Sequence, residues 1–226
     1  MIRAVVFDLD DTLYPEIEFV YSGYQAVAEA VRGRLGIEIY DDLTSLFGAG
    51  QRGDLFTPVL RKHLGDVQEP YVEQLVSIYR KHEPILHPYP EVPDLLRKLK
   101  PSHRLAIISD GRLCVQQRKL QALHLDGYFD VVIFTDQWGR EAWKPSTRSY
   151  EAVLERLSVS GMESVYIADN PSKDFHGARR VGMHTIRVRR PGNIYGQLEP
   201  PSSEFAPDLE IETLNGLDTA LADLSG

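Results

Sequence analysis

The segment IRAVVFDLDDTL, residues 2–13, joins a short apolar run to a cluster of carboxylates. The run over residues 2–7 is rich in β-branched side chains and is closed by a polar turn, which predicts a β-strand. Runs of the same kind recur at residues 104–109, 131–135, 165–168 and 184–188. Because nearly continuous apolar runs are typical of strands covered on both faces, these segments predict a parallel sheet.

Helix-like segments separate the last four runs. Apolar residues at helical spacing mark residues 113–123, 150–157 and 174–181. Alternating strands and helices imply right-handed crossovers, so the predicted fold class is α/β, with a Rossmann-like, doubly wound parallel sheet. The rest of the chain is expected to form a surface loop, an edge strand and a last helix, at residues 197–207, 209–211 and 214–224.

The first run breaks this alternation, because a long stretch without a convincing strand follows it. From Ile17 to Leu35 apolar residues recur at helical spacing, and Gly36 predicts the end of that helix. Further helices are predicted around residues 55–60 and 71–79. We therefore predict an all-helical domain over residues 16–85, inserted into a Rossmann-like core made of residues 1–15 and 86–226.

The composition restricts the partners of the chain. Its formal net charge of −8 disfavours a nucleic-acid partner, because phosphate backbones bind basic surfaces. No stretch reaches the roughly 18 apolar residues that span a bilayer, and the first residues do not resemble a signal peptide, because carboxylates close their short apolar run. Cys114 is the only cysteine, which excludes an intrachain disulfide and fits a reducing compartment. We expect a cytoplasmic protein without a membrane partner, and its oligomeric state stays open.

Polar side chains gather where the predicted strands end. In open α/β sheets ligands bind beyond the carboxyl ends of the strands, so these side chains are expected to converge on one edge. In chain order they are Asp8 and Asp10 after the first strand, Ser109, Asp110 and Gly111 at the second, Lys144 after the third, and Asp169 and Asp174 after the fourth.

These residue types belong together in one kind of chemistry. Clustered carboxylates repel one another, and a divalent cation relieves that repulsion. Oxygen ligands without Cys or His at metal spacing favour Mg²⁺. A lysine beside them can neutralise a phosphate oxygen and keep a carboxylate ionised as a nucleophile. Ser109 opens a turn into a helix whose N-terminal amides attract phosphate. The set points to phosphoryl transfer, in which positioning and charge neutralisation provide most of the catalysis.

Four segments, taken in order, resemble the four motifs of the haloacid dehalogenase superfamily. They are FDLDDTL (7–13), IISDG (107–111), WKP (143–145) and YIADNPSKD (166–174). The predicted helical insert matches the position of the C1 cap of that superfamily, so the resemblance covers nearly the whole chain. It implies a superfamily-type core with a C1 cap and the activity of a phosphatase.

The resemblance also implies roles for the reacting residues. Asp8 would be the nucleophile that forms an aspartyl-phosphate, and Asp10 would be the general acid and then the base that activates water. Ser109 and Lys144 would bind the phosphoryl group, and Lys144 would also hold Asp8 in place. The turn that continues from Ser109 would complete the substrate site with Asp110 and Gly111.

A metal site follows from the same resemblance. Mg²⁺ would be held by Asp8, by the backbone carbonyl of Asp10 and by Asp169, with Asp174 assisting directly or through water. Asn170 stands where many relatives carry a second adjacent acid, and Asp174 supplies the other acid in this chain.

The expected activity is a Mg²⁺-dependent phosphomonoester hydrolase for a small phosphorylated metabolite, either a sugar phosphate or a nucleoside monophosphate. Asp10 disfavours a carbon dehalogenase, because those relatives lack the second acid of the first motif. Two alternatives stay open, a phosphomutase that uses the same aspartyl-phosphate and a non-catalytic binding module. Four residues near the motifs or in the insert are expected to have structural roles and not to take part in catalysis or substrate binding. They are Asp11, Tyr14, Arg52 and Trp143.

Overall fold

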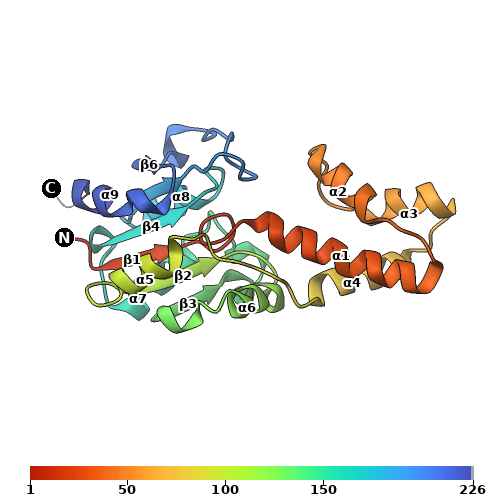
Figure 1. Cartoon of the computed structure of the whole chain (residues 1–226). Coiled ribbons are helices and arrows are strands. Elements are labelled where there is room, and N and C mark those ends of the chain that lie inside the picture. The colour runs from red at the N-terminus through yellow and green to blue at the C-terminus, as the bar shows by residue number, and fades with distance from the viewer. Residues whose placement is uncertain (225–226) are drawn as a thin grey trace. The chain divides into compact units, whose positions relative to one another are not determined.

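The structure, a computed structural model, describes residues 1–224 and contains two compact units (Figure 1). We call the first the sheet unit; it comprises Met1–Glu16 and Leu86–Gly226. We call the second the helical unit; it comprises Ile17–Ile85. The chain therefore leaves the sheet unit after the first strand and returns to complete the sheet. Within residues 1–224, no helix combines the length and the apolar character that crossing a bilayer requires.

The sheet unit is built on a six-stranded sheet in which all neighbouring strands are parallel. The strands are β1 (Ala4–Phe7), β2 (Arg104–Ser109), β3 (Val131–Phe134), β4 (Ser164–Ala168), β5 (His184–Val188) and β6 (Leu209–Ile211). These are the predicted strands with small shifts at their ends, and the predicted α/β fold class with a doubly wound parallel sheet is confirmed.

The strand order, β3-β2-β1-β4-β5-β6, reverses direction between β1 and β4. Phe7 at the end of β1 pairs with Ile107 of β2 on one side and with Ile167 of β4 on the other. Connections that leave a parallel sheet in opposite directions open a crevice at the carboxyl ends of the two strands. The residues that directly follow β1 and β4 therefore lie at the position where such sheets bind ligands.

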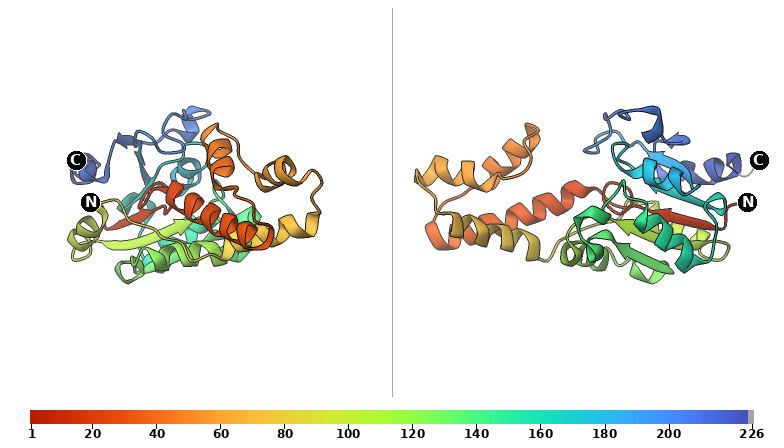
Figure 2. Two further views of the ribbon diagram at one scale, coloured as in Figure 1. Left: turned by 45° about the vertical axis from the view of Figure 1, so that its right-hand side comes forward. Right: turned by 180° about the vertical axis from the view of Figure 1, so that it is seen from behind.

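Helices cover both faces of this sheet (Figures 1 and 2). They are α5 (Val92–Leu99), α6 (Leu113–Ala122), α7 (Arg148–Leu157), α8 (Asp174–Arg180) and α9 (Leu217–Asp223). On one face, Tyr150 and Val153 of α7 and Phe175 of α8 pack with side chains of β1 to β4 in a buried core. Short 3-10 helices complete the loops at Asp126–Tyr128, Thr135–Trp138, Arg140–Ala142, Gly161–Glu163, Ser203–Phe205 and Leu214–Gly216.

The helical unit consists of α1 (Glu16–Leu35), α2 (Tyr40–Gly48), α3 (Phe56–Leu64) and α4 (Glu69–Lys81). The helix α1 forms because its apolar residues recur at helical spacing, and it ends at Gly36, whose φ of 69° favours glycine. α1 and α4 lie side by side, because the rings of Phe19 and Tyr24 contact Tyr79 (Figures 1 and 2). These aromatic rings form part of the core of this unit, together with buried aliphatic side chains.

Candidate active site

Three predicted metal ligands meet at the strand reversal. Asp8 follows β1, Asp169 follows β4 and Asp174 opens α8, and one carboxylate oxygen of each lies within 4.8 Å of the others. The backbone N–H of Asp8 donates to the carbonyl of Ile167 at 2.8 Å, which continues the sheet pairing beyond β1. All three acids are buried. The register of β1 and β4 therefore fixes the distance between the carboxylates.

The electrostatics of this acid cluster favour a bound cation. Burial raises the pKa of Asp8 to about 6, although the Lys144 amine counteracts the shift. Burial also raises the pKa of Asp169 well above its usual value, and the charges of Asp174 and Asp8 add to that shift. Asp169 Oδ2 is buried and has no hydrogen-bond partner in the described part of the chain. Hard oxygen donors with one unsatisfied oxygen fit a divalent cation.

Lys144 lies beside the acid cluster with a fully buried side chain. Its Nζ is 2.8 Å from Asp8 Oδ1 and 2.6 Å from Asp174 Oδ1, and it donates to the hydroxyl of Tyr166 at 2.9 Å. Burial acts to lower the pKa of this amine, but the carboxylates of Asp174 and Asp8 outweigh burial and raise the pKa well above its usual value. Lys144 therefore stays charged and holds Asp8 from one side.

The turn after β2 carries the other predicted phosphate-binding residues. Ser109 is fully buried, and its Oγ accepts a hydrogen bond from Gln116 Nε2 at 2.6 Å. The carboxylate of Asp110 accepts from Thr135 Oγ1 at 2.7 Å and from the backbone N–H of Lys144 at 3.2 Å. Asp110 thus connects the turn after β2 to the loop that carries Lys144.

Asp10 is held apart from the acid cluster. Its carboxylate accepts hydrogen bonds from Lys119 Nζ at 2.7 Å, from Gln116 Nε2 at 2.8 Å and from the hydroxyl of Tyr14. Burial raises the pKa of Asp10, but the charge of Lys119 and these hydrogen bonds outweigh burial and lower the pKa. Among the described residues, the side chain of Asp10 is not part of the group of clustered acids.

A cavity of about 130 Å³ opens onto these groups. It is lined by Asp8, Asp10, Asp110, Gly111 and Asp169 of the predicted set, together with Glu16, Trp143, Asn170, Lys173 and Tyr195. Ser109, Lys144 and Asp174 lie behind this lining with buried side chains. The structure therefore brings the predicted site residues together, some facing the cavity and some supporting it.

Comparison with known proteins identifies the family. Residues 5–188 match the model of the haloacid dehalogenase-like hydrolase family. The chain belongs to this family. It is 31% identical to the glyceraldehyde 3-phosphate phosphatase of Methanopyrus kandleri over 94% of each protein. It is 30% identical to the phosphoglycolate phosphatase of Aquifex aeolicus, covering 81% of this chain and 83% of the other.

A solved member of the family has the same architecture. The haloacid dehalogenase phosphatase of Thermococcus onnurineus superposes with a TM-score of 0.64 at 27% identity, covering 97% of this chain and 98% of the other. The resemblance stated from the four motifs is thus confirmed. The roles of the individual site residues stay predictions.

Several residues at this site were not predicted from the sequence. Lys119 and Gln116 come from α6, where the buried positions are Val115, Gln116, Lys119 and Leu120. Two polar residues on the buried face of a short helix are the signal that could have identified them. Lys173, which lies inside the fourth motif segment but was given no role, lines the cavity together with Tyr195, which lies outside all four motifs. Trp143, read as a packing residue, also lines the cavity.

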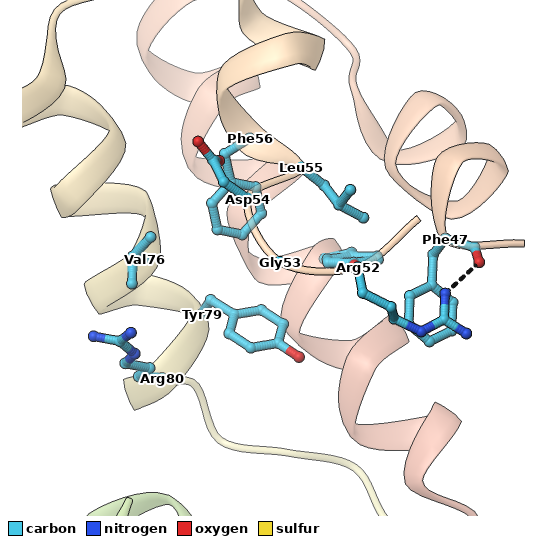
Figure 3. A pocket seen from close by; sticks show the side chains of 10 residues that line it. Phe47, Arg52, Gly53, Asp54, Leu55, Phe56, Val76, Tyr79 and Arg80 are labelled. Atoms are coloured by element: carbon cyan, nitrogen blue, oxygen red, sulfur yellow. Dashed lines mark hydrogen bonds between the residues drawn. The ribbon is translucent and has the colours of Figure 1, made fainter. Parts of the chain in front are cut away.

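A second and larger cavity, of about 460 Å³, lies entirely in the helical unit (Figure 3). Aromatic rings line it, including those of Tyr24, Phe56 and Tyr79. Arg52 places its guanidinium 3.9 Å from the centre of the Phe47 ring and donates to the Phe47 carbonyl at 2.8 Å. This cavity lacks a group of clustered acids among the described residues, so we assign the reaction chemistry to the smaller cavity of the sheet unit.

Proposed function

We propose that this protein is a Mg²⁺-dependent phosphomonoester hydrolase that transfers the phosphoryl group of a small metabolite to Asp8 and then to water. The observation that carries the proposal is the acid cluster of Asp8, Asp169 and Asp174 with the Lys144 amine 2.8 Å from Asp8 Oδ1. A buried lysine in contact with two acids of a cluster that could hold a cation suits phosphoryl transfer. The phosphatase names of its relatives support the reaction class.

The metal would be held by Asp8 and Asp169, with Asp174 assisting and the backbone carbonyl of Asp10 completing the protein ligands. When bound, it would neutralise the carboxylates and the phosphate oxygens so that the two can approach. Mg²⁺ suits this set because it prefers oxygen ligands and retains water and substrate phosphate oxygens in its shell.

In the first step a carboxylate oxygen of Asp8 attacks phosphorus, and the bond between phosphorus and the leaving oxygen breaks. Asp10 gives its proton to that oxygen. The negative charge of an entering phosphate raises the pKa of a neighbouring carboxylate, which lets Asp10 hold this proton. In the second step a water oxygen attacks phosphorus, Asp10 takes the proton of the water, and the bond to Asp8 breaks. Lys144 holds Asp8 during both steps.

The substrate class follows from the family and from the second unit. The names of the relatives, a glyceraldehyde 3-phosphate phosphatase and a phosphoglycolate phosphatase, support a small phosphorylated metabolite. We propose that the helical unit is the C1 cap and selects among such substrates, which include sugar phosphates and nucleoside monophosphates. A cap of this kind excludes bulk water from the reaction.

Phosphate release from p-nitrophenyl phosphate and from a panel of phosphorylated metabolites tests the proposal. Turnover should require a divalent cation, disappear with EDTA and return with Mg²⁺. Asp8→Asn should abolish it, whereas Asp94→Asn, at an acid whose side chain is 80% exposed, should not. Activity in Asp8→Asn equal to that of the wild type would refute the nucleophile. An isomerised sugar phosphate without free phosphate, observed by NMR, would identify a mutase instead, and a complete lack of turnover would favour a binding module.

A further inference from the structure

The carboxylate of Asp10 is held by two residues of α6 that lie outside the four motifs. Lys119 has a side chain that is only 5% exposed, and its Nζ is 2.7 Å from Asp10 Oδ1. Gln116, also buried, donates to Asp10 Oδ2 at 2.8 Å. Each carboxylate oxygen of Asp10 thus has its own donor from one helix, so rotation of the carboxylate breaks at least one hydrogen bond.

Gln116 also couples Asp10 to the turn after β2. Its Nε2 lies 2.6 Å from Ser109 Oγ and 2.8 Å from Asp10 Oδ2, and an amide nitrogen has two protons to donate. The opposite orientation of the amide would place its oxygen against the Asp10 carboxylate, which is repulsive. Because Ser109 Oγ accepts this bond, its own proton points away from Gln116, toward the backbone carbonyl of Asp110 at 3.5 Å. One side chain therefore orients both residues.

The close packing around Gln116 and Lys119 also indicates that these side chains are held in place. A Cβ added at Gly111, whose φ is 120°, would lie 3.1 Å from the side chain of Gln116. A glycine here gives Gln116 the space to reach both of its acceptors. The amine of Lys119 also lies 3.9 Å from Glu16 Oε1, so it balances two carboxylates that line the cavity. Because Lys119 is buried between two acids that line the cavity, it can affect the reaction as well as the packing of α6.

We propose that Lys119 and Gln116 are positioning residues that hold Asp10 in line with the leaving oxygen. This inference rests on the proposed function, because it assigns the two residues to the proton transfer that Asp10 performs there. All of these contacts lie within the sheet unit. Positioned proton transfer contributes roughly 10²–10⁴ in rate, and part of that factor is lost when the group can rotate away.

The dependence on the leaving group separates positioning from folding. An aryl phosphate such as p-nitrophenyl phosphate leaves without much protonation, whereas an alkyl phosphate requires a proton on the leaving oxygen. In Lys119→Met, kcat/KM for an alkyl phosphate turned over by the wild type should fall about tenfold more than kcat/KM for p-nitrophenyl phosphate. Lys119→Arg, which keeps the charge, should recover part of the loss. Gln116→Leu should also lower kcat/KM for the alkyl phosphate more than kcat/KM for p-nitrophenyl phosphate.

A double-mutant cycle then tests whether Lys119 acts through Asp10. In the Asp10→Asn background, Lys119→Met should change kcat/KM by less than about threefold, because the group that it positions no longer transfers a proton. Lys98→Met is the matched control, since Lys98 makes an exposed ion pair with Asp218 in the same unit, and it should leave the ratio unchanged.

Two results would overturn the inference while the proposed function stands. One is an equal loss for alkyl and aryl phosphates in Lys119→Met, and the other is an undiminished effect of Lys119→Met in the Asp10→Asn background. A wild-type protein that hydrolyses neither phosphate, or an Asp8→Asn variant with full activity, would instead refute the proposed function and this inference with it.

Discussion

Replacing Lys144 with methionine tests the charge balance on which the site depends. Methionine has nearly the length of lysine but no charge, so Asp8 and Asp174 lose the amine that lies 2.8 Å and 2.6 Å from their oxygens. The amine and both carboxylates are buried, and water cannot replace the lost contact without a rearrangement of the core. The substitution leaves at least one uncompensated charge in the interior.

The magnitude follows from the burial. Removing one partner of a buried ion pair costs about 3–5 kcal/mol, because the remaining charge stays in a low-dielectric interior. For a chain of this size, each kcal/mol corresponds to roughly 2–4 °C in Tm, so Lys144→Met should melt about 6–20 °C below the wild type without metal. Mg²⁺ at 100 times its Kd should return about 2.7 kcal/mol, because the cation compensates the same carboxylates.

Urea unfolding followed by tryptophan fluorescence measures this effect. The chain has two tryptophans, Trp138 and Trp143, and both belong to the sheet unit, so the signal reports the unit that contains the site. The titration is done in EDTA and again in Mg²⁺. Lys98→Met serves as the control, because its ion pair with Asp218 is more than half exposed and should contribute less than about 1 kcal/mol.

The reasoning would be refuted by a Lys144→Met variant that loses no more stability in EDTA than the control does. Such a result would mean that the amine of Lys144 compensates no buried charge in the free protein. A variant that is destabilised in EDTA but gains nothing from Mg²⁺ would contradict the cation site, while leaving the role of the lysine intact.

Two further predictions concern the packing and the pH response of the sheet unit. Gly177→Ala should lower the free energy of unfolding by about 1–3 kcal/mol and reduce activity, because the added Cβ would lie 2.5 Å from the Pro145 carbonyl oxygen, next to Lys144. Gly127→Ala is the control, because Gly127 has open space around it, and equal melting temperatures of the two variants would contradict the prediction. Burial raises the pKa of Glu16 from 4.5 to about 7, so its contribution to stability is present below pH 4.5 and is lost as the pH rises through 7. In EDTA, Glu16→Gln should therefore remove about 3 kcal/mol of the decline in unfolding free energy between pH 4.5 and 8, and an unchanged decline would refute this assignment.

The fold was predictable to the extent that it is encoded locally. The strands were found because each is a short apolar run bounded by polar turns, and α1 was found because its apolar stripe is long. α2 (Tyr40–Gly48) was missed because it buries only Leu43 and Phe47, and α5 (Val92–Leu99) was missed because it directly follows a proline-rich stretch. Helices this short take their stability from tertiary packing, which a local pattern does not contain.

The site was predictable where the topology determines it. Residues that follow parallel strands must meet at one edge, so Asp8, Asp169 and Lys144 could be brought together from their positions in the sequence. Lys119 could be noticed as a polar residue on the buried face of α6, but its contact with Asp10 could not be predicted, because that contact depends on the direction in which α6 leaves the turn after β2. For Tyr14 the sequence favoured a position in the core over a position in the site. The structure shows that its side chain is buried and that its hydroxyl also donates to Asp10.

Asp8 and Asp10 of the first motif are two residues apart, and the structure gives them opposite electrostatic environments. Asp8 lies among other buried acids, and its pKa is raised to about 6. Asp10 has a lysine of its own, and its pKa is lowered. Two carboxylates whose environments separate their pKa values are suited to different roles in one reaction. A cation at the acid cluster would stabilise the ionised form of Asp8 as the nucleophile. Lys119 favours the ionised form of Asp10, which suits the base of the second step, and the charge of the entering phosphate would favour its protonated form in the first step.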